Sequence, residues 1–246
     1  MYFRKQGDAG IMLVSLYVDD MIYTGSSKEL IYQFKMEMMK TFEMTDLGKL
    51  HYFLGIDIKQ TNTGIFIAQE KYVSDMLKGL NMENIEPVTT PMNTNEKITC
   101  EDATGMTDPQ NYRSIVGRLI YRTHTRPDIS FVVGVVSRFM HKPTKQHYGA
   151  VKRIIRYLAS TKHYGIWYLN SKRFVLKGYN DSDWAGSQED KKSTIGNCFS
   201  TGSGIISWQS KKQATVALSS TEAEYVAVTI TACQAVWLRK LIGDLM

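Results

Sequence analysis

Two adjacent acids, Asp19 and Asp20, stand in the middle of an apolar stretch that reads LYVDDMIY. Residues 11–18 are apolar and β-branched enough to predict a strand, and residues 21–24 predict a partner strand. Because Asp is a common turn residue, a plain turn is one interpretation. Asp-Asp is nevertheless a poor two-residue hairpin turn, and adjacent carboxylates repel unless a cation relieves them. The pair therefore predicts a hairpin tip that is either a simple turn or a ligand of a divalent metal such as Mg²⁺.

The composition sets the class of protein. A chain of 246 residues, 43% hydrophobic and 22% charged, can form one large or two modest globular domains. The net charge of +6 permits an anionic partner without proving one. Cys100, Cys198 and Cys233 are scattered, which indicates a reducing compartment and argues against a zinc site or disulfide scaffold. No apolar run approaches the ~20 residues of a membrane span, and the first residues resemble neither a signal nor a transit peptide.

The first third of the chain predicts a helix between two hairpins. Ser26, with Glu29 three residues on, is the expected N-cap of a helix that carries Leu30, Ile31, Phe34, Met38 and Phe42 on one face. Residues 52–58 and 65–68 predict strands joined by a Thr-Asn-Thr-Gly turn. A short helix follows, with Val73, Met76, Leu77 and Leu80 on its apolar face. The polar segment 81–110, which contains three prolines, is the expected linker.

Three helices are expected in the middle of the chain. The first is capped by Asp108 with Pro109 in its first turn, the second opens at TRPD, and the third begins near Thr144. Apolar residues at helical spacing predict the inward faces of the three helices: Tyr112, Ile115, Val116 and Leu119, then Ile129, Val132, Val133, Val136 and Met140, then Val151, Ile154, Ile155 and Leu158. The third helix also carries four basic residues, which are Lys145, Lys152, Arg153 and Arg156. A solvated helix face is the more common explanation for such charges, although contacts with a nucleic-acid backbone would use the same residues.

Short strands followed by helix fill the last third, which predicts an α/β or α+β domain. Asp181 and Asp183 stand at a strand end, and Glu222 and Glu224 stand at the start of the next helix. Thr221 with Glu224 fits a capping box, and Asp183 fits a turn, so both have local explanations. The functional alternative is that strand and helix carboxylates converge on Mg²⁺ for phosphodiester hydrolysis, as in sites that use two metals.

Eight segments in a fixed order carry a family resemblance. They are LYVDDMIYTGS, MTDLGKLHYFLGIDI, YRSIVGRLIY, TRPDISFVVGVVSRFM, RIIRYL, DSDWAG, SWQSKKQATVALSSTEAEY and WLRKL. Together they resemble the Pol polyprotein of copia-type LTR retrotransposons over nearly the whole chain. The resemblance implies that residues 1–90 are the C-terminal part of a reverse-transcriptase palm, 91–165 a helical thumb and connection region, and 166–246 the front of an RNase H-like domain.

The same resemblance assigns the polymerase residues. It places Asp19 and Asp20 at the two carboxylates of the family's YxDD hairpin, which help to bind two Mg²⁺ ions at the primer 3′ end, and Tyr17 and Val18 at its other two positions. The segment YFLG, which comprises Tyr52, Phe53, Leu54 and Gly55, resembles part of the hairpin that grips the primer backbone.

The resemblance also assigns two RNase H carboxylates. Asp181 matches the first, because it ends a strand as the family's acid does, and Glu224 matches the second, because Tyr225 and an alanine follow at the family spacing. The 43-residue gap between them leaves room for two strands. Asp183 and Glu222 match these positions less well.

The sequence departs from the family at three points. The family has a further polymerase Asp well upstream of YxDD, and the 18 residues before Asp19 are too few to include it. The family also has further RNase H acids beyond the point where this chain ends. We therefore expect both sites to be incomplete and the isolated chain to be inactive. Arg122 replaces a usual aliphatic residue in a helix, so its guanidinium needs a partner or an exposed position.

Three functions from different classes are consistent with these residues. The chain is expected to be part of an RNA-directed DNA polymerase with RNase H, a non-catalytic nucleic-acid-binding module, or an inactive relic. The family implies an RNA template, a DNA primer and an RNA–DNA hybrid as partners, and Mg²⁺ or Mn²⁺ as cofactor. Neither a membrane nor a small-molecule cofactor is expected. The family implies an intracellular location, in a cytoplasmic particle or the nucleus.

Overall fold

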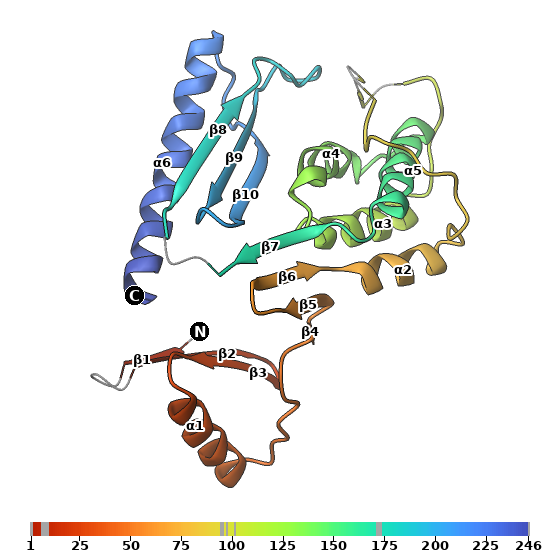
Figure 1. The fold of residues 1–246 in the computed structure, drawn as a ribbon. Coiled ribbons are helices and arrows are strands. Elements are labelled where there is room, and N and C mark those ends of the chain that lie inside the picture. The colour runs from red at the N-terminus through yellow and green to blue at the C-terminus, as the bar shows by residue number, and fades with distance from the viewer. Residues whose placement is uncertain are drawn as a thin grey trace. The chain divides into compact units, whose positions relative to one another are not determined.

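A computed structural model describes residues 2–5, 10–93, 96, 98–100, 102–170 and 174–245. The chain forms two compact units, one made of residues 1–51 with 242–246 and the other of residues 52–241. Each sheet in the described residues is antiparallel, and helices accompany the sheets in both units (Figure 1). The predicted mixed α and β class is therefore confirmed.

The first unit is a three-stranded sheet with one helix. Strands β1 (Tyr2–Lys5), β2 (Ile11–Tyr17) and β3 (Asp20–Gly25) pair in that order, and α1 (Lys28–Thr41) follows. The N-cap of α1 is Ser27, whose Oγ accepts from the Leu30 N–H, so the prediction of Ser26 was wrong by one residue. The Ser26 hydroxyl oxygen instead accepts from the Ile11 N–H at 2.9 Å, which holds the end of the hairpin to its start.

The second unit begins with a four-stranded sheet. Strands β4 (Tyr52–Phe53), β5 (Ile56–Gln60), β6 (Gly64–Ala68) and β7 (Gly165–Leu169) pair in that order. The predicted strand 52–58 is thus broken by a turn at residues 54–55. Strand β7, which the sequence grouped with the last third of the chain, hydrogen-bonds to β6 instead. A Cβ at position 165 would lie 2.1 Å from the Ile67 carbonyl oxygen, so glycine permits this close pairing.

Four helices pack around one hydrophobic core in this unit. They are α2 (Glu70–Gly79), α3 (Pro109–Arg122), α4 (Ser130–Val136) and α5 (Lys145–Ser160), with short 3₁₀ turns η2 (Pro127–Ile129) and η3 (Ser137–Phe139). The predicted N-cap of α3 is confirmed, because Asp108 accepts from the Gln110 N–H. The predicted start of α5 near Thr144 is confirmed too, and Thr144 caps the helix by accepting from the His147 N–H. The predicted inward faces are confirmed for the residues that are buried: Tyr112, Ile115, Val116, Leu119, Ile129, Val132, Val133, Val136, Val151, Ile154, Ile155 and Leu158. Met140, which was also predicted to be buried, is only partly buried against the same core.

The predicted linker at 81–110 is packed onto the helices. Ile98 belongs to the buried core, and Val88 and Met92 pack against it, while residues 94, 95, 97 and 101 lie outside the described residues. Apolar side chains within the polar segment explain this packing. The predicted boundaries at 90 and 165 consequently both fall inside the second compact unit.

The last third of the chain forms a third sheet and a long helix. Strands β8 (Lys177–Ser182), β9 (Thr194–Ser200) and β10 (Ile205–Lys212) pair in the order β10-β9-β8, with α6 (Ser220–Leu245) alongside (Figure 1). The two strands expected between Asp181 and Glu224 are therefore present.

Helix α6 differs from the expectation that no segment could span a membrane. Residues Ser220–Asp244 are long and apolar enough to cross one by length and composition, because few charged residues interrupt them. The same helix buries Ala223, Ala227 and Leu238, and Gln234 donates to Ser207 of β10 at 3.4 Å. Packing of this kind is also typical of a helix that covers a sheet.

Candidate functional site

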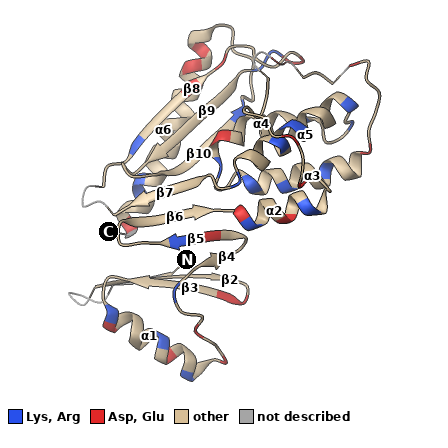
Figure 2. Ribbon diagram, turned by 45° about the vertical axis from the view of Figure 1, so that its right-hand side comes forward, with Lys and Arg blue, Asp and Glu red and all other residues tan. Residues whose placement is uncertain are grey.

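The acid pair lies at the tip of the β2–β3 hairpin. Tyr17 pairs with Asp20, so Val18 and Asp19 form the turn between the strands. Val18 has a φ of 52° and is 86% exposed, although a β-branched residue is disfavoured in this left-handed region. The hairpin thus places both carboxylates at an exposed end of the sheet, where Figure 2 shows a red segment between β2 and β3.

The donor chemistry of this tip fits a hard divalent cation. Asp19 and Asp20 are both exposed, and no hydrogen bond or ion pair among the described residues occupies either carboxylate. Mg²⁺ is usually held by one or two carboxylates, with substrate phosphates and water completing its shell. The part of the chain that the structure describes contains no cluster of three or more His, Cys, Asp or Glu side chains suited to a metal. The pair therefore supplies at most part of a metal site.

The segment Tyr52–Gly55 forms a second exposed turn, between β4 and β5. Leu54 and Gly55 have φ values of 46° and 78°, as a two-residue hairpin of the type I′ class requires. The Tyr121 hydroxyl of α3 donates a hydrogen bond to the Leu54 carbonyl oxygen. Tyr52 is half-exposed, with the Lys71 ammonium 5.3 Å from its ring centroid. Aromatic and cationic groups therefore lie together beside this turn.

The basic residues of α5 divide into two kinds. Arg153 Nη2 donates to Thr90 Oγ1 at 2.9 Å, and Arg156 Nε donates to the Glu86 carbonyl oxygen at 2.7 Å. The two arginines thereby hold the segment 86–90 against the helix. Lys152 is exposed, and its ammonium lies 5.0 Å from the centroid of the Tyr148 ring.

A cavity of about 650 Å³ lies beside these basic residues. Lys152, Arg153 and Arg156 line it together with Glu86 and Glu96, so acids share its wall. The acids reduce the attraction of this cavity for a phosphate.

Asp181 and Glu224 come from elements that a single side chain connects. Gln213 is 3% exposed, and its Nε2 donates to Ser182 Oγ at 3.2 Å and to the Ala223 carbonyl oxygen at 2.9 Å. Figure 1 shows the end of β8 and the start of α6 at the same end of the sheet. Because neighbouring side chains of a strand point to opposite faces, Asp181 lies on the face of β8 opposite to the one that Gln213 contacts. Gln213 thus joins the end of β8 to the start of α6, the two elements that carry these acids.

The two neighbouring acids, Asp183 and Glu222, both have local structural roles. The Asp183 carboxylate accepts from the Thr194 N–H, as a turn acid does. The cap of α6 is Ser219, which accepts from the Glu222 N–H at 3.1 Å, while Glu222 accepts from the Leu218 N–H at 2.7 Å. The predicted capping box of Thr221 and Glu224 was therefore wrong, because the helix begins two residues earlier. Glu224 is left free of that role.

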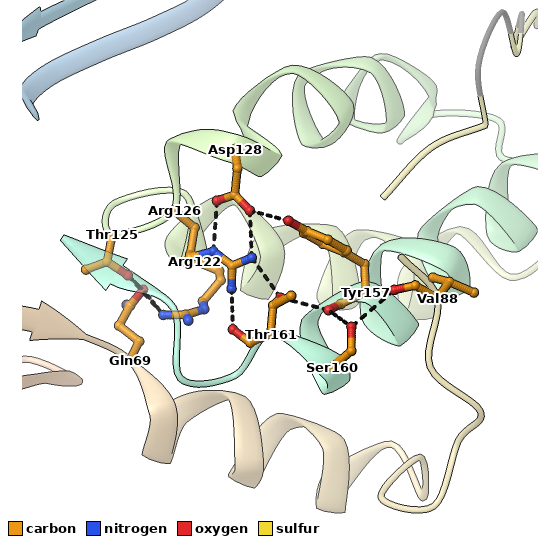
Figure 3. Close-up of polar contacts among 9 residues, drawn as sticks. All are labelled: Gln69, Val88, Arg122, Thr125, Arg126, Asp128, Tyr157, Ser160 and Thr161. Carbon is orange, nitrogen blue, oxygen red and sulfur yellow. Dashed lines mark hydrogen bonds and ion pairs between the residues drawn. The ribbon is translucent and has the colours of Figure 1, made fainter. Parts of the chain in front are cut away.

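A buried polar network inside the second unit was not anticipated. Arg122 is fully buried, and its Nη1 donates to Gln69 Oε1 at 3.0 Å and to Thr125 Oγ1 at 2.9 Å (Figure 3). Burial lowers the pKa of the Arg122 guanidinium to about 9. The sequence correctly required a partner for this residue, but nothing in it identified Gln69, which is 53 residues away.

A second buried arginine, Arg126, has its own set of hydrogen-bond partners. Arg126 is also buried, and it binds Asp128 through two hydrogen bonds and donates to the Thr161 carbonyl oxygen at 2.8 Å (Figure 3). Burial alone raises the pKa of Asp128, but the hydrogen bond and charge of Arg126 outweigh it, so the pKa lies below its usual value. The positive charge of Arg126 is thus paired with a carboxylate, whereas the hydrogen-bond partners of Arg122 are neutral side chains.

The chain is similar to a reverse-transcriptase family model and to transposon Pol polyproteins. A family model described as reverse transcriptase (RNA-dependent DNA polymerase) matches residues 1–94. The chain is 42% identical, over 99% of its length, to the Pol polyprotein from transposon RE1 of Arabidopsis thaliana, of which it spans 17%. It is 41% identical over its whole length to the Pol polyprotein from transposon TNT 1-94 of Nicotiana tabacum, of which it spans 19%.

A shorter relative is matched almost end to end. An uncharacterised mitochondrial protein of Arabidopsis thaliana is 41% identical to this chain over 92% of the chain and 94% of the relative. No solved structure matches the chain significantly. The chain therefore spans less than a fifth of the long polyproteins that it matches, and nearly all of this shorter one.

Proposed function

Because the chain belongs to the reverse-transcriptase family found in the Pol polyproteins of copia-type retrotransposons, we propose that Asp19 and Asp20 are metal ligands of a polymerase site. In this proposal the site acts within a whole polymerase, on an RNA template and a DNA primer, inside the cell. A bound Mg²⁺ or Mn²⁺ would activate the primer hydroxyl and neutralise charge on the incoming phosphate.

One observation carries the proposal, namely the geometry of the β2–β3 tip. Val18 adopts a strained φ, and the chain reverses within the two residues Val18 and Asp19. This tight turn places both Asp19 and Asp20 at the exposed tip. Strain of this kind is typical of sites where function fixes the backbone. Tyr17 and Val18 directly precede the acids and would contact the primer terminus or the incoming nucleotide.

Manganese titration followed by NMR tests the metal ligands without requiring turnover. We expect Mn²⁺ to broaden the amide signals of residues 17–21 first. Asp19→Asn or Asp20→Asn should each weaken this effect by roughly tenfold or more, since either removes half of the fixed negative charge. Asp75→Asn is the matched control, because it removes an exposed carboxylate from α2. Broadening that neither tip substitution changes would refute the assignment.

A primer-extension assay addresses the activity of this chain by itself. Extension of a DNA primer on an RNA template with Mg²⁺ or Mn²⁺ that is lost in Asp19→Asn would support the role of Asp19. Extension that Asp19→Asn leaves unchanged would contradict it.

A second candidate function is RNA-strand hydrolysis at Asp181 and Glu224, again within a whole protein. The observation in its favour is the contact of Gln213 with both supporting elements, next to each acid in the sequence. Because Asp181 faces the other side of β8, a metal shared by both acids would require β8 to twist at its end. Loss of Mn²⁺ broadening at residues 181–183 and 222–225 in Asp181→Asn and in Glu224→Gln is the expected result.

Nucleic-acid binding without chemistry is the alternative for the isolated chain. The net charge of +6 and the lysine and tyrosine beside the Tyr52–Gly55 turn favour it. We expect an RNA–DNA hybrid to bind with an affinity that falls as salt rises. Absence of any salt-dependent binding would leave only the third alternative, a chain without activity.

A further inference from the structure

We infer that Tyr121 is a positioning residue that holds the Tyr52–Gly55 turn in the conformation that meets the nucleic-acid backbone. The inference rests on the proposed function, because it presumes that this turn contacts nucleic acid. It adds a residue on α3, 66 positions after the turn, that the sequence did not single out.

The turn requires external support because its first central residue is not a good choice for its backbone. Two-residue hairpin turns of this type need φ > 0 at both central positions and favour Asn-Gly or Asp-Gly. Here Leu54 occupies the first position with a φ of 46°. A leucine in this region costs free energy, and such conformations persist where surrounding contacts hold them.

Tyr121 supplies that contact from outside the hairpin. Its hydroxyl donates to the Leu54 carbonyl oxygen, the backbone acceptor that lies between the two residues of the turn. The ring is itself fixed, with the Tyr72 centroid 5.0 Å away and the His124 centroid 5.7 Å away. Tyr72 on α2 and His124 in the loop after α3 thus restrain the ring whose hydroxyl binds the Leu54 carbonyl oxygen.

The other half of the turn is fitted to the same ring. A Cβ at Gly55 would lie 2.9 Å from the Tyr121 hydroxyl oxygen, and the φ of 78° at this residue already disfavours a side chain. The Leu54 side chain remains partly exposed above the turn. The turn is therefore exposed to solvent on the side of the Leu54 side chain and is held by Tyr121 of α3 through its backbone.

Tyr121→Phe tests the inference because it removes the hydroxyl and keeps the ring. We expect faster amide exchange at residues 54–56 and a hybrid affinity reduced about three- to tenfold, the range for the loss of one hydrogen bond. Tyr72→Phe is the matched control, because Tyr72 packs against the same ring and its hydroxyl makes no hydrogen bond to the turn among the described residues. The control should leave both readouts close to those of the unmodified chain.

A double substitution separates positioning from general support of the fold. If Tyr121 acts through the turn, Gly55→Ala should weaken hybrid binding, and adding Tyr121→Phe should weaken it by less than the product of the two separate effects. Fully independent effects would overturn the inference. So would Tyr121→Phe binding the hybrid normally, even with faster exchange, since Tyr121 would then only brace the hairpin.

The same measurements distinguish failure of the proposed function. If the unmodified chain binds no hybrid, or binds it without shifting the amide signals of residues 52–56, the presumed role of the turn is wrong. Tyr121 would then lose its part in binding whatever the exchange data show. If the unmodified chain binds through the turn but Tyr121→Phe has no effect, the proposed function stands and only the inference about Tyr121 fails.

Discussion

Arg126 donates two hydrogen bonds to Asp128, from Nε to Oδ1 at 2.8 Å and from Nη2 to Oδ2 at 2.6 Å. Arg122, one helical turn earlier in the chain, is equally buried but has no carboxylate among its hydrogen-bond partners in the described residues. The two arginines therefore offer a comparison between a buried cation that is paired with an acid and one that is not.

Replacing Arg126 should destabilise the second unit. Arg126→Met would leave Asp128 without its ion pair and would remove one of the two donors to the Thr161 carbonyl oxygen, the other being the Tyr164 N–H. Breaking a buried ion pair from one side typically costs 3–5 kcal/mol, and we expect about 2–3 kcal/mol here because the Asp128 side chain is 36% exposed. Urea unfolding measures the loss. A midpoint equal to that of the unmodified chain would show that solvent compensates Asp128.

Replacing Arg122 should stabilise the second unit or leave its free energy of unfolding unchanged. Its Nε and Nη2 are buried without a hydrogen-bond partner among the described residues, so the charged group bears an uncompensated desolvation cost. Arg122→Met keeps the length of the side chain, and Thr125 Oγ1 would still donate to Gln69 Oε1 at 2.8 Å. We expect a change between zero and about 2 kcal/mol in favour of the variant. A loss of more than 1 kcal/mol would mean that Arg122 has partners, such as internal water, that compensate its charge.

The Asp128 carboxylate should make stability depend on pH in the acid range. Its pKa is lower in the folded chain than the usual 3.8, so between these values the unfolded chain binds more protons. The stabilisation is fully present above pH 3.8 and is lost as the pH falls through the folded value. Unfolding of the unmodified chain and of Asp128→Asn, measured between pH 6 and pH 3, should give a difference that shrinks below pH 3.8. A constant difference would rule out this linkage.

The sequence predicted those features that depend on local pattern. Helix periodicity located the buried faces of α3, α4 and α5, and the cap Asp108 followed from its side-chain chemistry. Hairpin positions followed from runs of β-branched residues and turn residues. Each of these signals lies within a few neighbouring positions, so tertiary packing did not need to be known.

Features that depend on distant pairing were not predicted. Strand β7 joins β6 across almost a hundred residues, and a sequence read locally assigned it to the next region. The Gln69–Arg122 and Leu54–Tyr121 contacts likewise link segments more than 50 residues apart. The acids at 19 and 20 were located because a hairpin tip is local, whereas the face of β8 that carries Asp181 depended on the register of the sheet.

Gln213 should be a residue whose substitution is costly even though it lies outside every regular element. Gln213→Met removes the amide that donates to both Ser182 and Ala223, leaving a carbonyl oxygen at the start of α6 without that donor. Two lost hydrogen bonds predict a loss of about 1–3 kcal/mol. We also expect faster amide exchange in the first turn of α6, while the exchange of β9 and β10 stays unchanged.

Gln209→Met is the control for this prediction, because Gln209 lies on β10 with an exposed side chain. It should change neither the unfolding midpoint nor the exchange of α6, since its amide remains hydrated in both states. Equal behaviour of the two variants would show that the Gln213 amide does not hold α6 against β8. The backbone N–H of Gln213 donates to the Ser193 carbonyl oxygen at 2.8 Å in either case, so the substitution tests the side chain alone.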